Sequence, residues 1–330
     1  MDPIRILVNA PLFEETVPRI AAVSPRVQVT HIGSLMKAER DGDPAASRQL
    51  DALLSVAEVV AGMRLPDRLL QRAPHLRWVQ LTSAGVDHIL DDALRNSHVV
   101  LTNASNLHSF AIAEFALTSC LALAKNVREC YRQKDARLWE PYNPVILRGK
   151  TMGIVGFGHI GRRVARMASA FEMRVIGLRR SLAQPGTARY AETVLPSSQI
   201  DRLLAASDFV VLTLPLTRET RHLVGAKELQ AMKPSAFLIN VSRGPIVDEQ
   251  ALANALRGGD IAGAAMDVFA VEPLPTDSPL LDAPNFFYSP HIAGWLREYP
   301  EMVLDVFLRN LTRYVKGQRL LSIIDKRRGY

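Results

Sequence analysis

The stretch TMGIVGFGHIGRRVARMASAF, residues 151–171, decides the fold that we expect for this chain. Its first five residues form an apolar run typical of a buried strand, and the segment from Arg162 has the pattern of a helix. Between them stand Gly156, Gly158 and Gly161, at the spacing that allows a tight turn, a close approach to a pyrophosphate and packing of helix on strand. N–H groups at the start of that helix would meet the phosphates. The stretch therefore predicts a dinucleotide-binding site.

Two arginines follow the next strand, RVIGL, at the place where an NAD site usually has an acidic residue for the ribose hydroxyls. Guanidinium groups bind phosphate through paired hydrogen bonds and stack on adenine, so Arg179 and Arg180 favour NADP(H), with NAD(H) still possible. Ser181 could add a hydroxyl to the same phosphate. The alternative is that both arginines are simply solvated after a strand.

Further apolar runs alternate with helical or loop segments on both sides of this stretch. The runs are IRILVN, VQVTHI, AEVVAG, LRWVQL and HVVLTN before it, and RVIGL, DFVVLTL, AFLINV, IAGAAMDVF and NFFYS after it. Helices are expected over residues 110–124 and about 298–315. The alternation predicts an α/β fold of two doubly wound, Rossmann-like domains.

Composition narrows the class of partner. The 330 residues are 48% hydrophobic with a net charge of +7, and the basic residues are scattered among acidic ones, which favours anionic substrates over nucleic acid. Cys120 and Cys130 are the two cysteines, too few for a disulfide framework or a metal-ligand cluster, so we expect no metal and a reducing, cytoplasmic location. The longest apolar segment, residues 110–124, is short for a bilayer and includes Glu114, so we expect no membrane association.

Three polar residues each follow a predicted strand, where ligands of open α/β sheets bind. They are Arg243, Glu272 and His291. Together they suit reduction of a 2-keto acid: Arg243 can bind the carboxylate and keto oxygen, His291 can donate a proton, and Glu272 can hold the imidazolium. Taken singly, they could equally be a surface arginine, an exposed carboxylate and a hydrogen-bonded histidine.

The chain resembles the D-isomer-specific 2-hydroxy-acid dehydrogenases over nearly its whole length. The motifs are AGVDHI, GFGHIG, TLPLTRETRHLVG, MKPSAFLINVSRGPIVDE, GAAMDVFAVEPLPTDSPL, SPHIAG and LLSIIDKRRGY. The resemblance implies that Arg243, Glu272 and His291 are the catalytic set, and that the backbone of Ala84, Gly85 and Val86 binds the substrate carboxylate. The cofactor site that it implies comprises Gly156, Gly158, His159, Ile160, Gly161, Arg179, Arg180, Ser181, Leu214, Pro215, Thr220, Val241, Asp267 and Gly294.

The resemblance also implies a discontinuous plan. A substrate domain of residues 1–102 and 293–330 would surround a dinucleotide-binding domain of residues 103–292, whose arm forms a homodimer. In its arginine pair, the chain resembles members of the family that prefer NADP, such as the glyoxylate and hydroxypyruvate reductases. A bulkier 2-keto acid as substrate, or a non-catalytic dinucleotide-sensing interaction protein, are the alternatives. The sequence leaves open the roles of Arg64, His108, Trp139 and Trp295.

Overall fold

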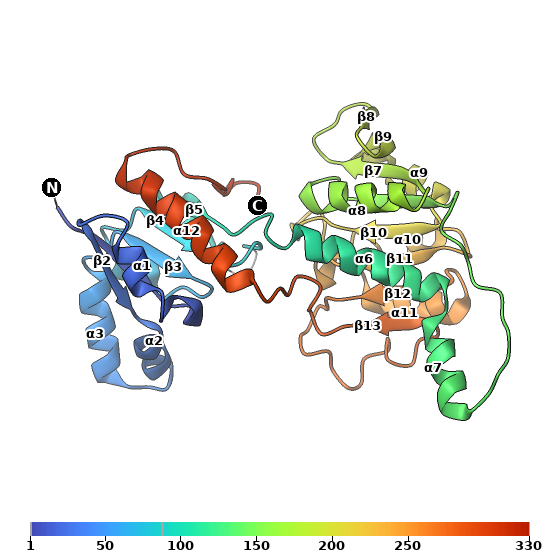
Figure 1. Ribbon diagram of the computed structural model, residues 1–330, viewed down its shortest axis with the longest axis horizontal. Coiled ribbons are helices and arrows are strands. Elements are labelled where there is room, and N and C mark those ends of the chain that lie inside the picture. The colour runs from blue at the N-terminus through green and yellow to red at the C-terminus, as the bar shows by residue number, and fades with distance from the viewer. Residues whose placement is uncertain (1, 87–88, 330) are drawn as a thin grey trace. The chain divides into compact units, whose positions relative to one another are not determined.

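The computed structural model describes residues 2–86 and 89–329 (Figure 1). The chain forms two compact units, Met1–Leu107 with Leu296–Tyr330, and His108–Trp295. Each unit contains one sheet. That residues 1–102 and 293–330 form the substrate domain, and residues 103–292 the dinucleotide-binding domain, remains a prediction.

The first unit has a five-stranded sheet in the order β2-β1-β3-β4-β5, and all of its strand pairs are parallel. The strands are β1 (Ile4–Val8), β2 (Val27–His31), β3 (Val59–Gly62), β4 (Trp78–Leu81) and β5 (Val100–Thr102). The helices are the 3-10 turn η1 (Pro11–Phe13), α1 (Val17–Ala21), α2 (Gly33–Arg40), α3 (Pro44–Leu54), α4 (Leu69–Arg72), α5 (Asp92–Asn96) and α12 (Tyr299–Val315).

Helices cover both faces of this sheet. Successive strand residues point to opposite faces, so neighbouring residues of one strand pack against different helices. In β1, Ile6 and Val8 pack with residues of α12, whereas Leu7 packs with residues of α3. The central strands β3 and β4 are buried along their whole length, as expected inside a parallel sheet, whereas the edge strand β2 is only partly buried.

The second unit has an eight-stranded sheet in the order β13-β12-β11-β10-β6-β7-β9-β8, parallel except between β8 and β9. Its strand order reverses at β6, between β7 and β10. The strands are β6 (Thr151–Val155), β7 (Arg174–Arg179), β8 (Gly186–Ala188), β9 (Ala191–Pro196), β10 (Phe209–Leu212), β11 (Phe237–Asn240), β12 (Gly263–Met266) and β13 (Phe286–Tyr288).

Helices cover both faces of the second sheet (Figure 1). One apolar cluster contains α6 (Ser109–Ala124) and α8 (His159–Ala170), and the other contains α9 (Ile200–Ala206), α10 (Ala226–Gln230) and α11 (Glu249–Gly258). The remaining elements are α7 (Val127–Ala136) and the 3-10 turns η2 (Ser197–Gln199) and η3 (Gly244–Ile246).

The α/β fold with two parallel, doubly wound sheets confirms the predicted fold class. The ten apolar runs named above all contain strands. β8 and β9 were not predicted, because β8 has no buried residue and β9 has only a short apolar run, Val194–Pro196, after its polar start. In the described ranges no single helix has the length and apolar composition to cross a bilayer; α6 and α7 pass that test together only as a pair bent by 56°.

Candidate active site

The glycine turn lies at the carboxyl end of β6, where the strand order reverses. Gly156 has φ +104°, and a Cβ there would lie 2.8 Å from the backbone of Thr213, which follows β10. A Cβ on Gly161 would lie 2.4 Å from the Gly156 carbonyl oxygen, whereas a Cβ on Gly158 would meet no atom within 4 Å. The turn is therefore tight at its first and third glycines and open at the second, as a bound pyrophosphate requires.

The first turn of α8 begins at this open position. Its N-cap is Gly158, so no side chain caps the N–H groups of the helix, among them those of His159 and Ile160. Burial, and then the charges of Arg162 and Arg163, lower the pKa of His159, which keeps its imidazole neutral near pH 7. The helix start thus offers backbone donors to an anion.

The two arginines lie beside the turn, because the Leu178 carbonyl accepts hydrogen bonds from the N–H groups of Gly156 and Phe157. Arg179 ends β7, and Arg180 and Ser181 follow it; all three are exposed. The Thr217 hydroxyl, with smaller effects from Arg180 and Arg218, holds the pKa of Glu219 below its usual range. Arg180 therefore neighbours the loop that follows β10.

That loop carries three of the predicted cofactor residues, Leu214, Pro215 and Thr220. The Thr220 hydroxyl donates to the Pro215 carbonyl at 2.8 Å and accepts from the N–H of Thr217 at 2.7 Å. At the start of the loop, the Thr213 hydroxyl donates to the Gly156 carbonyl at 2.7 Å. Thr220 therefore shapes the loop, and Thr213 joins the loop to the glycine turn.

Arg243 stands three residues beyond β11, next to the buried Val241. The fully buried Asn240 shapes the turn: its amide donates to the Arg243 carbonyl at 3.0 Å, and its Oδ1 accepts from the hydroxyl of Ser242 at 2.6 Å. The half-buried guanidinium donates from Nη1 to the Ser242 carbonyl at 2.7 Å. These contacts fix the backbone that carries the arginine.

His291 and Glu272 form a hydrogen-bonded pair. His291 Nδ1 lies 2.7 Å from Glu272 Oε2, and the two side chains are 50% and 36% exposed. A carboxylate only accepts hydrogen bonds, so Nδ1 carries the proton and Nε2 is the ring nitrogen that can exchange one with a ligand. This is the arrangement of a histidine acid held by a carboxylate.

The buried Asp267 orders the turn that presents His291. Its carboxylate accepts from the Ser289 hydroxyl at 2.6 Å and from the N–H groups of Ile292 and Ala293 at 2.8 and 3.0 Å. His291 itself has φ +56°, a strained conformation for a residue with a side chain. That Asp267 belongs to the cofactor site, as the resemblance implies, stays a prediction.

His108, whose role the sequence left open, belongs to the same neighbourhood. Its Nδ1 lies 2.6 Å from the carbonyl oxygen of Gly294, another predicted cofactor residue. Burial lowers the pKa of His108, and the positive charges of Arg243 and His291 lower it further. The structure therefore groups His108 with two members of the catalytic set.

The predicted carboxylate-binding backbone, Ala84, Gly85 and Val86, lies in the first unit after β4. Ser83 shapes it, because its hydroxyl donates to the Gly85 carbonyl at 2.9 Å. Arg64, also in this unit, is exposed and accepts from Asn9 Nδ2 through its carbonyl at 2.6 Å.

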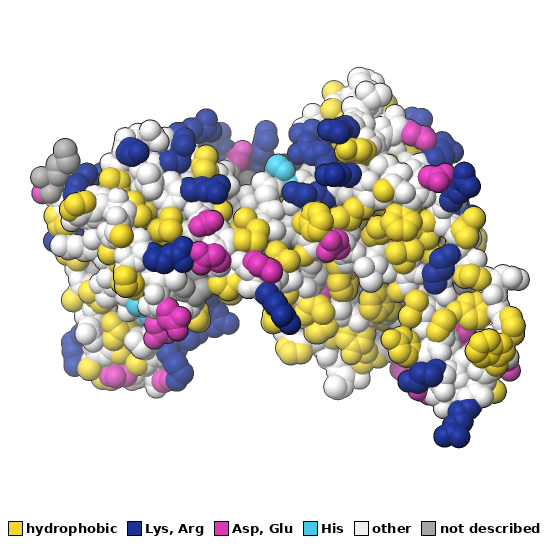
Figure 2. All heavy atoms as spheres, in the orientation of Figure 1, with side chains coloured by type: hydrophobic (Ala, Val, Ile, Leu, Met, Phe, Trp, Pro, Cys, Tyr) yellow, Lys and Arg dark blue, Asp and Glu magenta, His cyan; other side chains and the backbone are white. Residues whose placement is uncertain are grey.

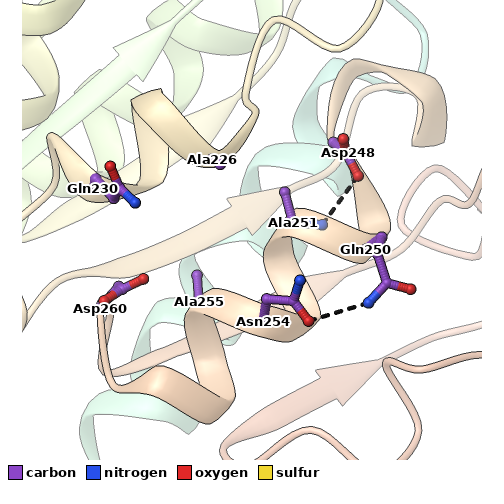
Figure 3. Close-up of a pocket in the computed structure, with 8 residues that line it drawn as sticks. All are labelled: Ala226, Gln230, Asp248, Gln250, Ala251, Asn254, Ala255 and Asp260. Carbon is purple, nitrogen blue, oxygen red and sulfur yellow. Dashed lines mark hydrogen bonds between the residues drawn. The ribbon is translucent and has the colours of Figure 1, made fainter.

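A separate hollow of about 400 Å³ lies between α10 and α11 (Figure 3). Gln230, Asp248, Gln250, Asn254 and Asp260 are among the residues that line it, and none of the predicted site residues does. Throughout residues 2–86 and 89–329, no cluster of three or more His, Cys, Asp or Glu side chains could hold a metal ion.

Comparison with known proteins gives a family match within the second unit. Residues 117–293 match the family described as D-isomer specific 2-hydroxyacid dehydrogenase, NAD binding domain. The chain is 41% identical over 277 residues to glyoxylate/hydroxypyruvate reductase B of Pectobacterium carotovorum, covering 80% of this chain and 84% of that protein. It is 35% identical over 289 residues to the glyoxylate reductase of Thermofilum pendens, covering 84% and 82%.

Among solved structures, the chain is similar to the NADPH-dependent glyoxylate/hydroxypyruvate reductase of Sinorhizobium meliloti in complex with NADP and sulfate. The TM-score is 0.82 at 26% identity, over 99% of this chain and all of that one.

Proposed function

This chain belongs to the D-isomer specific 2-hydroxyacid dehydrogenases, and we propose that it reduces a small 2-keto acid, glyoxylate or hydroxypyruvate, with a hydride from NADPH. The product is the corresponding 2-hydroxy acid, of D configuration where it is chiral. The enzyme is an oxidoreductase with NADP(H) as its preferred cofactor and NAD(H) possible. The observation that carries the proposal is the 2.7 Å pair of His291 and Glu272 in the unit that holds the glycine turn.

We propose distinct roles for the catalytic set. Arg243 binds the substrate carboxylate and polarises the keto oxygen, because a guanidinium can donate two parallel hydrogen bonds. His291 donates the proton from Nε2 to that oxygen, and Glu272 stabilises the imidazolium through Nδ1. The bound cofactor supplies the hydride.

The second unit has residues suited to two parts of NADP, the pyrophosphate and the 2′-phosphate. The open Gly158 and the uncapped start of α8 suit the pyrophosphate, and the exposed Arg179 and Arg180 suit a 2′-phosphate. Figure 2 shows basic side chains gathered over α8. We therefore assign the second unit as the cofactor domain and the first, with the backbone of Ala84–Val86, as the substrate domain.

We also propose a homodimer through the arm, in the cytoplasm, where both free cysteines would remain reduced. Exposed apolar side chains cluster on α7 and the segment after it, and Trp139 is 94% exposed. Figure 2 shows hydrophobic side chains over α6 and α7. A patch of this kind suits an interface, and the other members are Tyr131, Leu138, Tyr142, Val145 and Ile146. Light scattering of the wild type and Trp139→Glu would test it, because the charge should give monomers.

The decisive experiment is the initial rate of cofactor oxidation by the purified protein, with NADPH and NADH side by side. Glyoxylate, hydroxypyruvate, pyruvate, phenylpyruvate and a branched 2-keto acid form the panel. We expect fast turnover of the two small acids with NADPH, and D-glycerate from hydroxypyruvate. Fast turnover confined to the larger acids would show that the substrate is a bulkier 2-keto acid. Tight NADPH binding without turnover of any acid would overturn the enzymatic proposal in favour of dinucleotide sensing.

A further inference from the structure

Glu249 is a half-buried carboxylate at the start of α11, in the segment that follows Arg243. It is not needed to cap the helix, because Asp248 is the N-cap and accepts from the N–H of Ala251 at 3.0 Å. Glu249 Oε1 instead accepts from the N–H of Ala270 at 2.6 Å, in the loop after β12. The side chain therefore joins two segments that both belong to the candidate site.

The peptide that Glu249 holds is tightly placed on its other side as well. A Cβ on Gly244 would lie 1.9 Å from the carbonyl carbon of Phe269 and 2.3 Å from the nitrogen of Ala270. The backbone next to Arg243 thus packs directly against the Phe269–Ala270 peptide. Gly244 and the Glu249 carboxylate together fix its position.

This peptide determines where Glu272 lies. The N–H of Phe269 donates to Glu272 Oε1 at 2.9 Å, and Glu272 Oε2 then meets His291 Nδ1 at 2.7 Å. Ala270, Val271 and Glu272 are exposed, so burial does not hold this part of the loop. The position of this part of the loop therefore depends on the hydrogen bonds that the N–H groups of Phe269 and Ala270 donate to Glu272 and Glu249.

We propose that Glu249 is a positioning residue for the reduction proposed above: its carboxylate anchors the Phe269–Glu272 loop so that Glu272 stays paired with His291. Without that anchor, Glu272 would sample positions out of reach of the imidazole. Proton donation to the substrate would then slow, because the carboxylate that orients the imidazole through Nδ1 would be misplaced. Glu249 would thereby act on the proton transfer without touching the substrate.

A different role for Glu249 would be general support of α11, because an acidic side chain in the first turn interacts favourably with the helix dipole. The two roles depend on different properties of the side chain. Anchoring needs an oxygen that accepts a hydrogen bond, whereas the dipole interaction needs the negative charge. Glu249→Gln keeps the acceptor and removes the charge, and Glu249→Met has similar length but lacks the oxygen.

The test compares these two variants in the holoenzyme, with Gln250→Ala as the matched control, since the Gln250 side chain donates to Asn254 within α11. We expect Glu249→Met to lower kcat by about 10- to 100-fold, the effect of a misplaced catalytic group, with little change in KM for NADPH. Glu249→Gln should stay within about threefold of the wild type, as should the control.

A second readout does not depend on turnover. The hydrogen-bonded Nδ1 proton of His291 should give a downfield proton resonance, assigned by its loss in Glu272→Gln. It should persist in Glu249→Gln and disappear or broaden in Glu249→Met, or in Glu249→Ala if the methionine variant does not fold. An unchanged resonance and kcat in the variant without the oxygen would overturn the proposal, as would a glutamine variant as impaired as the methionine one. Absence of wild-type turnover would count against the proposed function alone.

Discussion

The two parallel sheets of this chain have related topologies but differ at the point where the strand order reverses. In the first sheet that point lies between β1 and β3, and the side chain of Asn9 fills it: a Cβ on Gly62 would lie 1.7 Å from Asn9 Oδ1. In the second sheet it lies between β6 and β10, where Gly158 leaves open space. Open α/β sheets bind ligands at this point, so the same topology gives a dinucleotide site only where the backbone leaves room.

The strand next to the reversal also differs between the sheets. β2 ends in His31, which contacts the Ala10 carbonyl oxygen at 3.3 Å, whereas β7 ends in Arg179 and continues into Arg180. The second sheet therefore carries exposed positive charge beside an open turn. Such a difference is local, so single substitutions can test it.

The largest loss of cofactor affinity is expected from distorting the glycine turn, which is tight at Gly156. Gly156→Val would place a side chain at φ +104° and against the Thr213 backbone, so NADPH affinity should fall by at least about 100-fold. Fluorescence titration with NADPH measures it. Gly186→Ala is the control, because a Cβ there meets no atom within 4 Å. Wild-type affinity in Gly156→Val would remove the turn from the binding site.

Loss of the proposed acid should lower turnover instead of cofactor affinity. His291→Ala should lower kcat by about 10²- to 10⁴-fold while NADPH affinity stays nearly unchanged, because proton transfer is lost and the turn is intact. Steady-state rates and NADPH titration separate these quantities. His98→Ala is the control in the first sheet, where His98 precedes β5 and contacts the Leu76 carbonyl oxygen at 3.1 Å. Unchanged kcat would rule out the acid role.

The arginine pair should give a smaller and more selective effect. Replacing Arg179 and Arg180 by alanine should reduce the preference for NADPH over NADH by about 10- to 100-fold, the value of charge-assisted hydrogen bonds to a phosphate. Dissociation constants for both cofactors measure it, with His31→Ala as the matched change at the end of β2. Equal losses for the two cofactors would assign the pair to general charge.

Opening the filled point of the first sheet should cost stability without creating a second site. Asn9→Ala removes the 2.6 Å bond to the Arg64 carbonyl and leaves a small void, so unfolding free energy should fall by about 1–2 kcal/mol. Urea unfolding measures that loss. One NADPH should still bind per chain. Binding of a second NADPH would show that the Asn9 side chain alone prevents the first sheet from binding a dinucleotide.

The smallest effect concerns pH. Because burial and the charges of Arg243 and His291 lower the pKa of His108, its neutral form is favoured in the folded second unit, and stability is lost as pH falls through the ordinary histidine value of about 6.5. In the first unit, burial raises the pKa of Glu39, but hydrogen bonds from Arg72 and Ser47 outweigh it and lower the pKa below its usual value. The contribution of Glu39 to stability is therefore lost only as the pH falls into the range where carboxyl groups titrate.

Peptide-resolved hydrogen exchange at about pH 7.5 and about pH 5.5, corrected for intrinsic rates, would compare the two units. We expect the second unit to lose protection first, and His108→Gln to reduce that loss. Equal losses in both units, unaffected by the substitution, would contradict the sign derived for His108.

The sequence determined the parts of this protein that depend on local patterning. Continuous apolar runs specify buried parallel strands, and the glycines after residues 151–155 specify the turn that a pyrophosphate needs. Arg243, Glu272 and His291 were identified because each follows such a strand. The long motifs were specific enough to indicate the family before any geometry was known.

Tertiary structure alone decided which side chains support that site. Asn9 fills the reversal point of its sheet, His108 lies near Arg243 and His291, and Glu249 reaches the loop of Glu272. None of these contacts follows from spacing along the chain, because each joins segments that are distant in sequence and depends on side-chain direction after folding. Patterning sets the elements and their edges, whereas packing sets which polar groups find partners there.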